Sequence, residues 1–247
     1  MQELIEIHII AYNEQIMLPF TIAHYKKMFG KPKIVIHDNH STDHTVTIAK
    51  ANGCEVITFD TDGMNDTIQS VIKSQAAMNA TAKWVLCIDC DEECLLNTED
   101  LLALEERGIN AVHFEGWDIF DSVESPWMVK VPMGCKSPGY YKPVLLRTGE
   151  FSNIVFGAGA HNLEILTPAD GKQVNWSMHE YKLLHYKHWS SGYNIKRSAE
   201  LAVRQSIENL QRGYSTHFAL PENSHQQWFD DHDRSKEVIV DKLIPVE

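Results

Sequence analysis

Short apolar runs alternate with segments of helical periodicity along the N-terminal part of the chain. The apolar runs are rich in Ile, Val and Leu and end in polar turns, as buried strands do. We expect strands over 3–10, 33–38, 55–59 and 84–88. The segments between them repeat apolar residues every three or four positions, as amphipathic helices do. This alternation favours a mostly parallel α/β sheet flanked by helices.

The second half of the chain is less regular. Further strands are expected over 111–120, 140–147 and 181–188. Residues 190–212 have the apolar periodicity of one amphipathic helix, and the tail from Pro221 is polar and rich in His and Asp.

No internal repeat or low-complexity linker divides the chain. We therefore expect one α/β domain over 1–190, made of two halves, 1–95 and 96–190. A C-terminal helix and tail over 191–247 would follow it. The hydrophobic content of 43% suffices for a sizeable core.

Composition narrows the range of functions. The formal net charge of −12 argues against a nucleic-acid-binding surface, which needs a basic footprint. No window is apolar enough for a transmembrane segment, and the N-terminus lacks the features of a signal peptide. The odd count of five cysteines then indicates reduced thiols and a cytoplasmic protein. Peripheral contact with a membrane and the oligomeric state are left open.

Polar side chains follow the expected strands. The carboxyl ends of parallel strands meet at one edge of a sheet, where α/β proteins bind ligands. Asp89 and Asp91 end the fourth strand, and Glu92 and Glu93 come directly after them. Such a pair of aspartates suits a divalent cation carried by a diphosphate.

Three motifs lie at these strand ends. They are Ala11-Tyr12-Asn13-Glu14, Asp38-Asn39-His40-Ser41-Thr42-Asp43-His44-Thr45 and Asp89-Cys90-Asp91-Glu92. In this order and spacing they resemble the signature of family 2 glycosyltransferases of the GT-A fold. The second matches the family pattern D-N-x-S-x-D-x-T at every fixed position, and the third is the D-x-D motif. The resemblance covers residues from about 3 to 95 well and the remainder loosely.

The resemblance implies a nucleotide-sugar-dependent transferase with a Rossmann-like, mixed and mostly parallel sheet. Its donor would be a nucleoside-diphosphate sugar, with UDP as the family's commonest carrier, and its acceptor a hydroxyl of a glycan or other molecule. Asp91 would hold Mn²⁺ or Mg²⁺, with His185 completing the metal shell and Asp89 beside it. The donor would contact Ala11, Tyr12, Asn13, Glu14, Asp38, Lys73, Asp89 and Cys90.

The identity of the general base stays open, and its candidates all lie in the second half of the chain. Related enzymes carry a small-residue loop that ends in His-Glu, whereas here Gly159-Ala160-His161 is followed by Asn162. The resemblance leans to an inverting reaction, which needs a base for the acceptor proton. The candidates for this base are Asp118, Glu115, His161 and Glu164. The candidates for a sugar-stacking platform are Trp117, Trp127, Trp176 and Trp189.

Two other functions remain open from the residues. A nucleotidyltransferase that makes a nucleotide sugar also binds metal on an α/β sheet, but it usually has a glycine-rich, basic loop after its first strand. Residues 11–14 contain neither glycine nor a basic residue. A non-catalytic Cys/His metal-binding module would use Cys87, Cys90 and Cys94, but their place in and beside an apolar strand favours packing.

Overall fold

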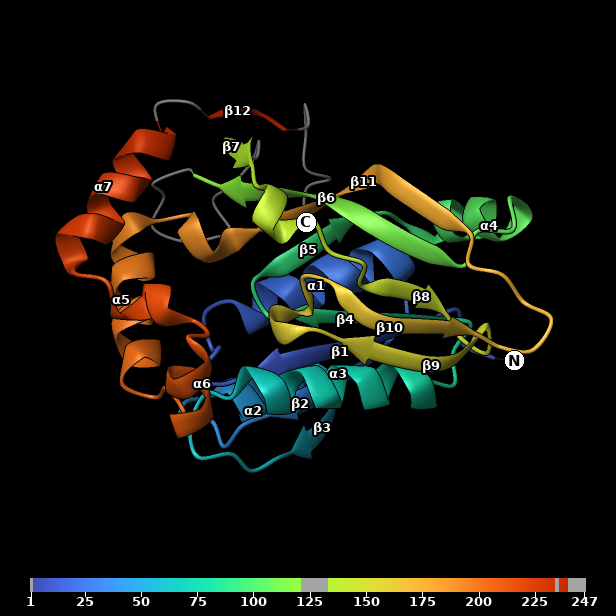
Figure 1. Ribbon diagram of the computed structural model, residues 1–247, viewed down its shortest axis with the longest axis horizontal. Helices are drawn as coiled ribbons and strands as arrows, with labels where there is room; N and C mark the ends of the chain where they lie inside the picture. The colour runs from blue at the N-terminus through green and yellow to red at the C-terminus, as the bar shows by residue number, and fades with distance from the viewer. Residues whose placement is uncertain (1, 121–132, 234–235, 240–247) are drawn as a thin grey trace.

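The computed structural model describes residues 2–120, 133–233 and 236–239. Within them one ten-stranded sheet has the order β12-β7-β6-β8-β4-β1-β2-β3, with β11 beside β6 and β5 beside β11 (Figure 1). Its first four strands are mutually parallel. They are β1 (Ile5–Ala11), β2 (Lys33–Asp38), β3 (Glu55–Thr58) and β4 (Trp84–Asp89).

The strand–helix alternation predicted for the N-terminal half is confirmed. Helices α1 (Leu18–Phe29), α2 (Thr45–Ala51) and α3 (Asp66–Asn79) connect the four parallel strands. Gly30 closes α1 with φ 72°, a left-handed conformation that costs glycine little. Asn65 caps α3 by accepting the backbone N–H of Ile68.

The later strands make the sheet mixed. Strand β8 runs antiparallel to both β4 and β6, whereas β6 and β11 are parallel. A separate two-stranded sheet pairs β9 with β10. The remaining elements before α5 are β5 (Glu92–Leu95), α4 (Thr98–Glu106), β6 (Ala111–Ile119), β7 (Met133–Lys136), η2 (Pro138–Tyr140), β8 (Leu145–Arg147), β9 (Phe151–Phe156), η3 (Ala158–Ala160), β10 (Leu163–Pro168), β11 (Trp176–His185) and η4 (Tyr186–His188). The predicted fold class, a mixed α/β sheet flanked by helices, is therefore confirmed.

The structure adds a strand directly after β4 and shortens one of those predicted. Glu92 and Glu93, which follow β4, lie in β5 and are only 1% exposed. Pairing with β11 draws this strand into the sheet, and His185 stands opposite Glu92 in the register. Of the strand expected over 140–147, only β8 at its end pairs with the sheet.

The single helix predicted over 190–212 is wrong. The chain forms α5 (Ser191–Ala202) and α6 (Ile207–Arg212), separated by four residues that bond to the loop before α3. Met64 donates its N–H to Arg204 O and accepts the N–H of Ser206. Gly63 makes this approach feasible, since a Cβ there would lie 2.1 Å from Arg204 O. We call residues 203–218, which cross the sheet edge here, the C-terminal strap.

The tail from Pro221 is more ordered than its polar composition indicated. It forms α7 (Glu222–Asp233), after η5 (Thr216–Ala219), and β12 (Glu237–Val238) pairs with β7. Helices α5, α6 and α7 gather at one end of the molecule, toward which β1 points (left in Figure 1). No helix of the described residues is both long and apolar enough to cross a membrane. The predicted division of the chain at residue 190 stays a prediction.

The core lies between the sheet and its helices. Trp84, Ile7, Ile9, Leu86 and Ile88 are fully buried at its centre. Each large apolar side chain of this kind contributes about 1.5–3 kcal/mol on burial. Cys87 and Cys94 are buried among them as free thiols, and so is Cys90. This placement supports the packing interpretation of the cysteines.

A buried polar chain crosses β1 and β2 on the face beside α3. His37 lies 2.9 Å from His8, which lies 3.0 Å from the carboxylate of Glu6. Lys33 and Thr81 also bond to this carboxylate, so all its partners are internal. Burial, followed by the influence of His8, lowers the pKa of His37 to about 4.

The depressed pKa of His37 predicts acid sensitivity of the fold. The unfolded chain, with an ordinary pKa of 6.5, takes up a proton that the folded chain resists, so stability falls as the pH drops from about 6.5 to about 4. Replacing His37 with Gln should reduce the loss of unfolding free energy between pH 7.5 and pH 5 by about 1–2 kcal/mol. Urea unfolding at the two pH values measures this. Equal losses in both proteins would contradict the prediction. Glu6, His8, Lys33, Glu55 and Lys73 face or influence the same site and are unchanged in the variant.

Candidate active site

A cleft opens at the carboxyl ends of β1 and β4, beneath the C-terminal strap. It encloses a cavity of about 170 Å³. Eight of the residues predicted for the site line it: Ala11, Tyr12, Glu14, Asp89, Cys90, Asp91, His161 and His185. The other five, which do not line it, are Asn13, Asp38, Lys73, Asp118 and Glu164.

The first aspartate of the D-x-D motif lies between two lysines. Asp89 accepts hydrogen bonds from Lys73 Nζ at 2.7 Å and from Lys142 Nζ at 3.3 Å. Lys142 also bonds to the buried carboxylate of Glu92. Although burial would raise the pKa of Asp89, Lys73 and then Lys142 hold it well below its usual range. Asp89 is therefore an ionised carboxylate whose charge is already compensated by protein cations.

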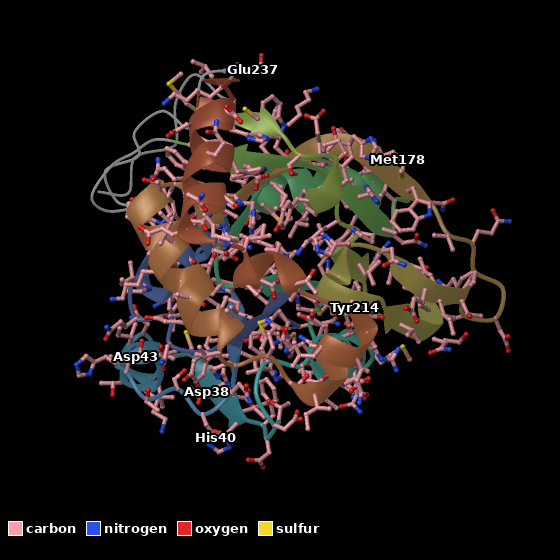
Figure 2. All side chains as sticks on the ribbon, turned by 60° about the vertical axis from the view of Figure 1, so that its left-hand side comes forward. Asp38, His40, Asp43, Met178, Tyr214 and Glu237 are labelled. Carbon is pink, nitrogen blue, oxygen red and sulfur yellow. The ribbon has the colours of Figure 1, made fainter. Side chains whose placement is uncertain are left out.

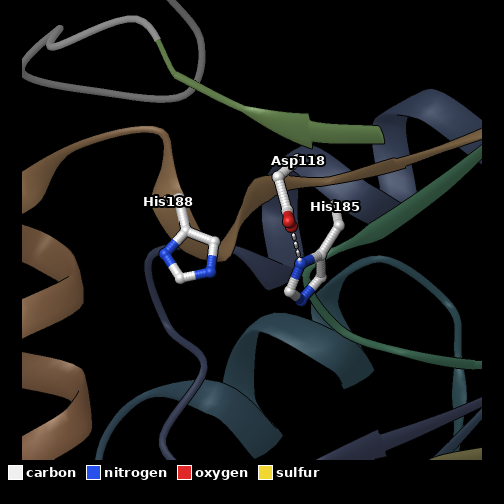
Figure 3. A group of neighbouring side chains, drawn as sticks. All are labelled: Asp118, His185 and His188. Carbon is white, nitrogen blue, oxygen red and sulfur yellow. Dashed lines mark hydrogen bonds and ion pairs between the residues drawn. The ribbon is translucent and has the colours of Figure 1, made fainter. Parts of the chain in front are cut away.

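The second aspartate has a different environment. Asp91 Oδ2 faces His185 Nε2 at 3.5 Å, and its side chain keeps 25% of its exposure. On the far side of the imidazole, Nδ1 lies 2.6 Å from Asp118 Oδ1 (Figure 3). Burial alone would lower the pKa of His185, but Asp91 and the bond to Asp118 outweigh it and raise the pKa to about 9. Asp118 thus fixes the ring so that Nε2 points at Asp91.

This arrangement fits a divalent cation between Asp91 and His185. A carboxylate oxygen and an imidazole nitrogen 3.5 Å apart can both reach an ion at about 2.0–2.2 Å. Metal-binding histidines usually donate their other nitrogen to a carboxylate, as His185 does to Asp118. Asp89, occupied by its two lysines, lies beside this pair rather than completing it.

A second set of potential ligand atoms lies deeper. Single ligand atoms of Asp118, His185 and His188 all fall within 4.8 Å of one another (Figure 3). Their polar atoms have protein partners, however: Asp118 binds His185, and His188 Nδ1 contacts the amide of Asn194. All three are buried, so a diphosphate has less access to them than to Asp91.

Tyr12 and Glu14 meet the C-terminal segment at the other end of the cleft. Arg197 of α5 bonds to Glu14 Oε1 at 2.5 Å and to Tyr12 O at 2.7 Å. Burial, opposed by Arg197, raises the pKa of Glu14 to about 7. The guanidinium of Arg204, on the strap, stacks 3.2 Å from the centre of the Tyr12 ring and bonds to Asn39.

The second motif shapes the loop after β2. Asp38 is 2% exposed and accepts the backbone N–H of Ser41. Asn13 bonds to Thr42 and so joins the first motif to the second. Asp38, His40 and Asp43 lie together at one edge of the molecule, near the carboxyl end of β2 (Figure 2). Asn39, rather than Asp38, lines the cleft, and the predicted contact between Asp38 and the base stays a prediction.

The base candidates are spread apart. His161 is exposed in the cleft lining, edge-on to the Tyr140 ring, and Tyr140 stacks on His185. Gly159 permits this, because a Cβ there would meet the His161 ring at 2.6 Å. Asp118 lies behind His185, and Glu164 is exposed on β10. Glu115 is paired with Lys136. Of the four candidates, only His161 lines the cleft.

Several lining residues were not predicted from the sequence. The basic ones are Lys142, Lys187, Arg197 and Arg204, and the aromatic ones are Tyr140 and Phe218. They come from irregular segments or from the C-terminal helices, where a lone Lys or Arg has no distinguishing local pattern. None of the candidate platform tryptophans lines the cleft among the described residues, and Trp127 lies outside those residues.

Known proteins of solved structure resemble this chain only at low sequence identity. A search of curated proteins found no match. Among solved structures, S. aureus TarS has a TM-score of 0.45 at 16% identity, covering 91% of this chain and 42% of TarS. Glucosyl-3-phosphoglycerate synthase from Mycobacterium tuberculosis, in complex with Mn²⁺, UDP and glucosyl-3-phosphoglycerate, has a TM-score of 0.33 at 18% identity, covering 47% of this chain and 44% of that one. The chain thus spans less than half the length of either protein.

The family comparison covers the segment that carries all three motifs. Residues 6–103 match the family described as glycosyl transferase family 2. This range runs from β1 through β5 into α4 and includes both aspartates of the D-x-D motif. The match confirms the resemblance seen in the motifs and favours a glycosyltransferase over a nucleotidyltransferase or a non-catalytic metal module. The segment of this chain that is similar to glycosyl transferase family 2 is therefore residues 6–103.

Proposed function

We propose that the chain is a metal-dependent glycosyltransferase. It moves a sugar from a nucleoside-diphosphate sugar, UDP-linked, to a hydroxyl of a glycan or other acceptor. The observation that carries the proposal is the Asp91–His185 pair, oriented by Asp118, in the same cleft as Tyr12. A nucleotide bound along the cleft would place its base near Tyr12 and its diphosphate near Asp91.

Asp91 and His185 would hold Mn²⁺ or Mg²⁺. A cation at this position supplies Lewis-acid stabilisation of the diphosphate as it departs. The residues around it bind and orient the donor: Lys73 and Lys142 fix Asp89, and Arg197 fixes Glu14 beside Tyr12. These contacts are all made within the protein, so the fold itself holds the polar groups of the site in place.

The proposed transfer inverts the anomeric carbon. The acceptor oxygen bonds to that carbon while the bond to the diphosphate breaks, and the acceptor proton passes to a base. His161 suits this role best among the candidates, since its exposed imidazole lines the cleft and in its neutral form accepts a proton. Asp118 instead acts as a positioning residue, because its carboxylate is committed to His185.

Asp91→Asn tests the metal site. The variant should retain its fold but lose donor turnover by about 100-fold or more, because an amide oxygen lacks the charge that holds the cation. Release of UDP from a panel of UDP-sugars with Mn²⁺, and again in excess chelator, measures this. The control is Asp60→Asn, which removes the same charge from a side chain that is 94% exposed. Undiminished turnover in chelator would refute metal dependence.

Asp118→Asn separates the two roles considered for Asp118. If Asp118 positions His185, the variant should need about 10–100-fold more Mn²⁺ for half-maximal activity and approach wild-type turnover once the metal is saturating. If Asp118 is the general base, turnover should stay low at every Mn²⁺ concentration. Activity measured against Mn²⁺ concentration distinguishes these results, and near-UV circular dichroism checks the fold.

A further inference from the structure

Lys187 is a buried cation that the proposed function does not yet use. It lies on η4, two residues after His185, and the whole residue is 7% exposed. The N–H of Tyr186 donates to Asp91 O at 2.7 Å, which ties η4 to the loop that carries the second aspartate. Lys187 lines the same cleft as Asp91 and His185.

The partners of this ammonium group are unusual. Its Nζ lies 2.7 Å from His217 Nε2 and 4.0 Å from the centre of the Phe218 ring. Among the residues that the structure describes, no carboxylate lies within 4.0 Å of Nζ. Lys142, which is also buried in the same cleft, is paired directly with Glu92 and Asp89. Lys187 therefore has an imidazole and an aromatic face where Lys142 has two anions.

An ammonium group buried without an anion destabilises a folded chain. The carboxylates of Asp91 and Asp118 favour the charged form of Lys187 without contacting it. The groups that do contact Nζ, the neutral His217 imidazole and the Phe218 ring, offset this cost only in part. A residue that lowers the stability of the fold is expected at a functional site, where it is retained because it binds a ligand. A cation that faces the cleft and has no anion in direct contact is suited to bind an anion that arrives with the substrate.

We propose that Lys187 binds the diphosphate of the donor directly and that His217 of the C-terminal strap positions it. This inference rests on the proposed function for the identity of the anion. The diphosphate would thus be held by Asp91 and His185 through the cation and by Lys187 through a charge-assisted hydrogen bond.

His217 can perform this positioning because the strap is anchored beside it. Ser215 Oγ donates to Asp66 Oδ2 at 2.8 Å, and Asn209 bonds to the same carboxylate at 3.1 Å. An ammonium group has no acceptor atom, so His217 must accept through Nε2. The imidazole thereby directs Nζ toward one side of the cleft and leaves its other two protons for a ligand.

Lys187→Met tests the inference by comparing ligands with and without phosphates. In Mn²⁺ buffer, the ratio of the Kd for uridine to the Kd for UDP should fall about tenfold or more in the variant, since a bond to a charged group is lost. Lys187→Arg keeps the charge and should retain most of the preference. Lys196→Met is the matched control, because it removes an exposed lysine from α5 and leaves the cleft unaltered.

The variant should also melt no lower than the wild type in the absence of ligand. A Met fills the volume of the lysine stem and removes a buried charge that no anion contacts. A binding loss with an unchanged or raised Tm identifies a ligand-binding role, whereas lost binding with a lower Tm that Lys187→Arg does not rescue would overturn the inference. His217→Phe should reduce the UDP preference, and His217→Gln, which keeps an acceptor, should preserve it.

Inorganic pyrophosphate with Mn²⁺ separates this inference from the proposed function. If pyrophosphate raises the Tm of the wild type and not of Lys187→Met, the lysine is an anion site even where UDP fails to bind. If pyrophosphate raises the Tm of neither protein, or of both equally, Lys187 is not the diphosphate residue. In that case, UDP binding that depends on Mn²⁺ would still support the proposed function, but without a role for Lys187.

Discussion

The buried ion network at the end of β4 is the constraint on which the rest of the site depends. Glu92 is almost fully buried and Asp89 lies beside it, a placement that would strongly disfavour folding if either charge were uncompensated. Lys142 bridges the two carboxylates, and Lys73 reaches Asp89 from α3. Removing one partner of such a buried pair typically costs about 3–5 kcal/mol. The network therefore fixes β4, α3 and the segment before β8 relative to one another.

This network also separates the two aspartates of the D-x-D motif by function. Because protein cations neutralise Asp89, its neighbour Asp91 is the carboxylate that remains for an ion in the cleft. The N-terminal part of the chain supplies these acids, and the second half supplies Lys142, His185, Lys187 and Arg197. A chain of net charge −12 can thus present a cleft suited to an anionic donor, since the sign of a site is set by its local groups.

The sequence predicted the parts of the fold that local patterns determine. Apolar periodicity located β1 to β4, the D-x-D motif located Asp91, and the family resemblance indicated His185. The structure places Asp91 Oδ2 and His185 Nε2 3.5 Å apart. The break between α5 and α6 was not predictable, because it arises from backbone pairing with Met64, far away in sequence. The position of Asp118 behind His185 could not be predicted from the sequence either, because it depends on the parallel register of β6 and β11. The cations of the cleft lie in segments without periodicity, where a lone lysine looks like any surface lysine.

The different contacts of Lys142 and Lys187 show that the role of a buried lysine depends on its neighbours rather than on the number of charged residues in the cleft. Both are buried lysines in one cleft, and a composition or a list of lining residues treats them alike. Lys142 contacts two carboxylates and is satisfied within the protein, so its charge serves the fold. Lys187 contacts an imidazole and an aromatic ring, so its charge stays available to a ligand. The C-terminal strap holds that imidazole, and Arg204 of the same strap stacks on Tyr12. One segment thereby contacts both the expected base site and the expected diphosphate site, so its position over the cleft is part of how the proposed donor site is built.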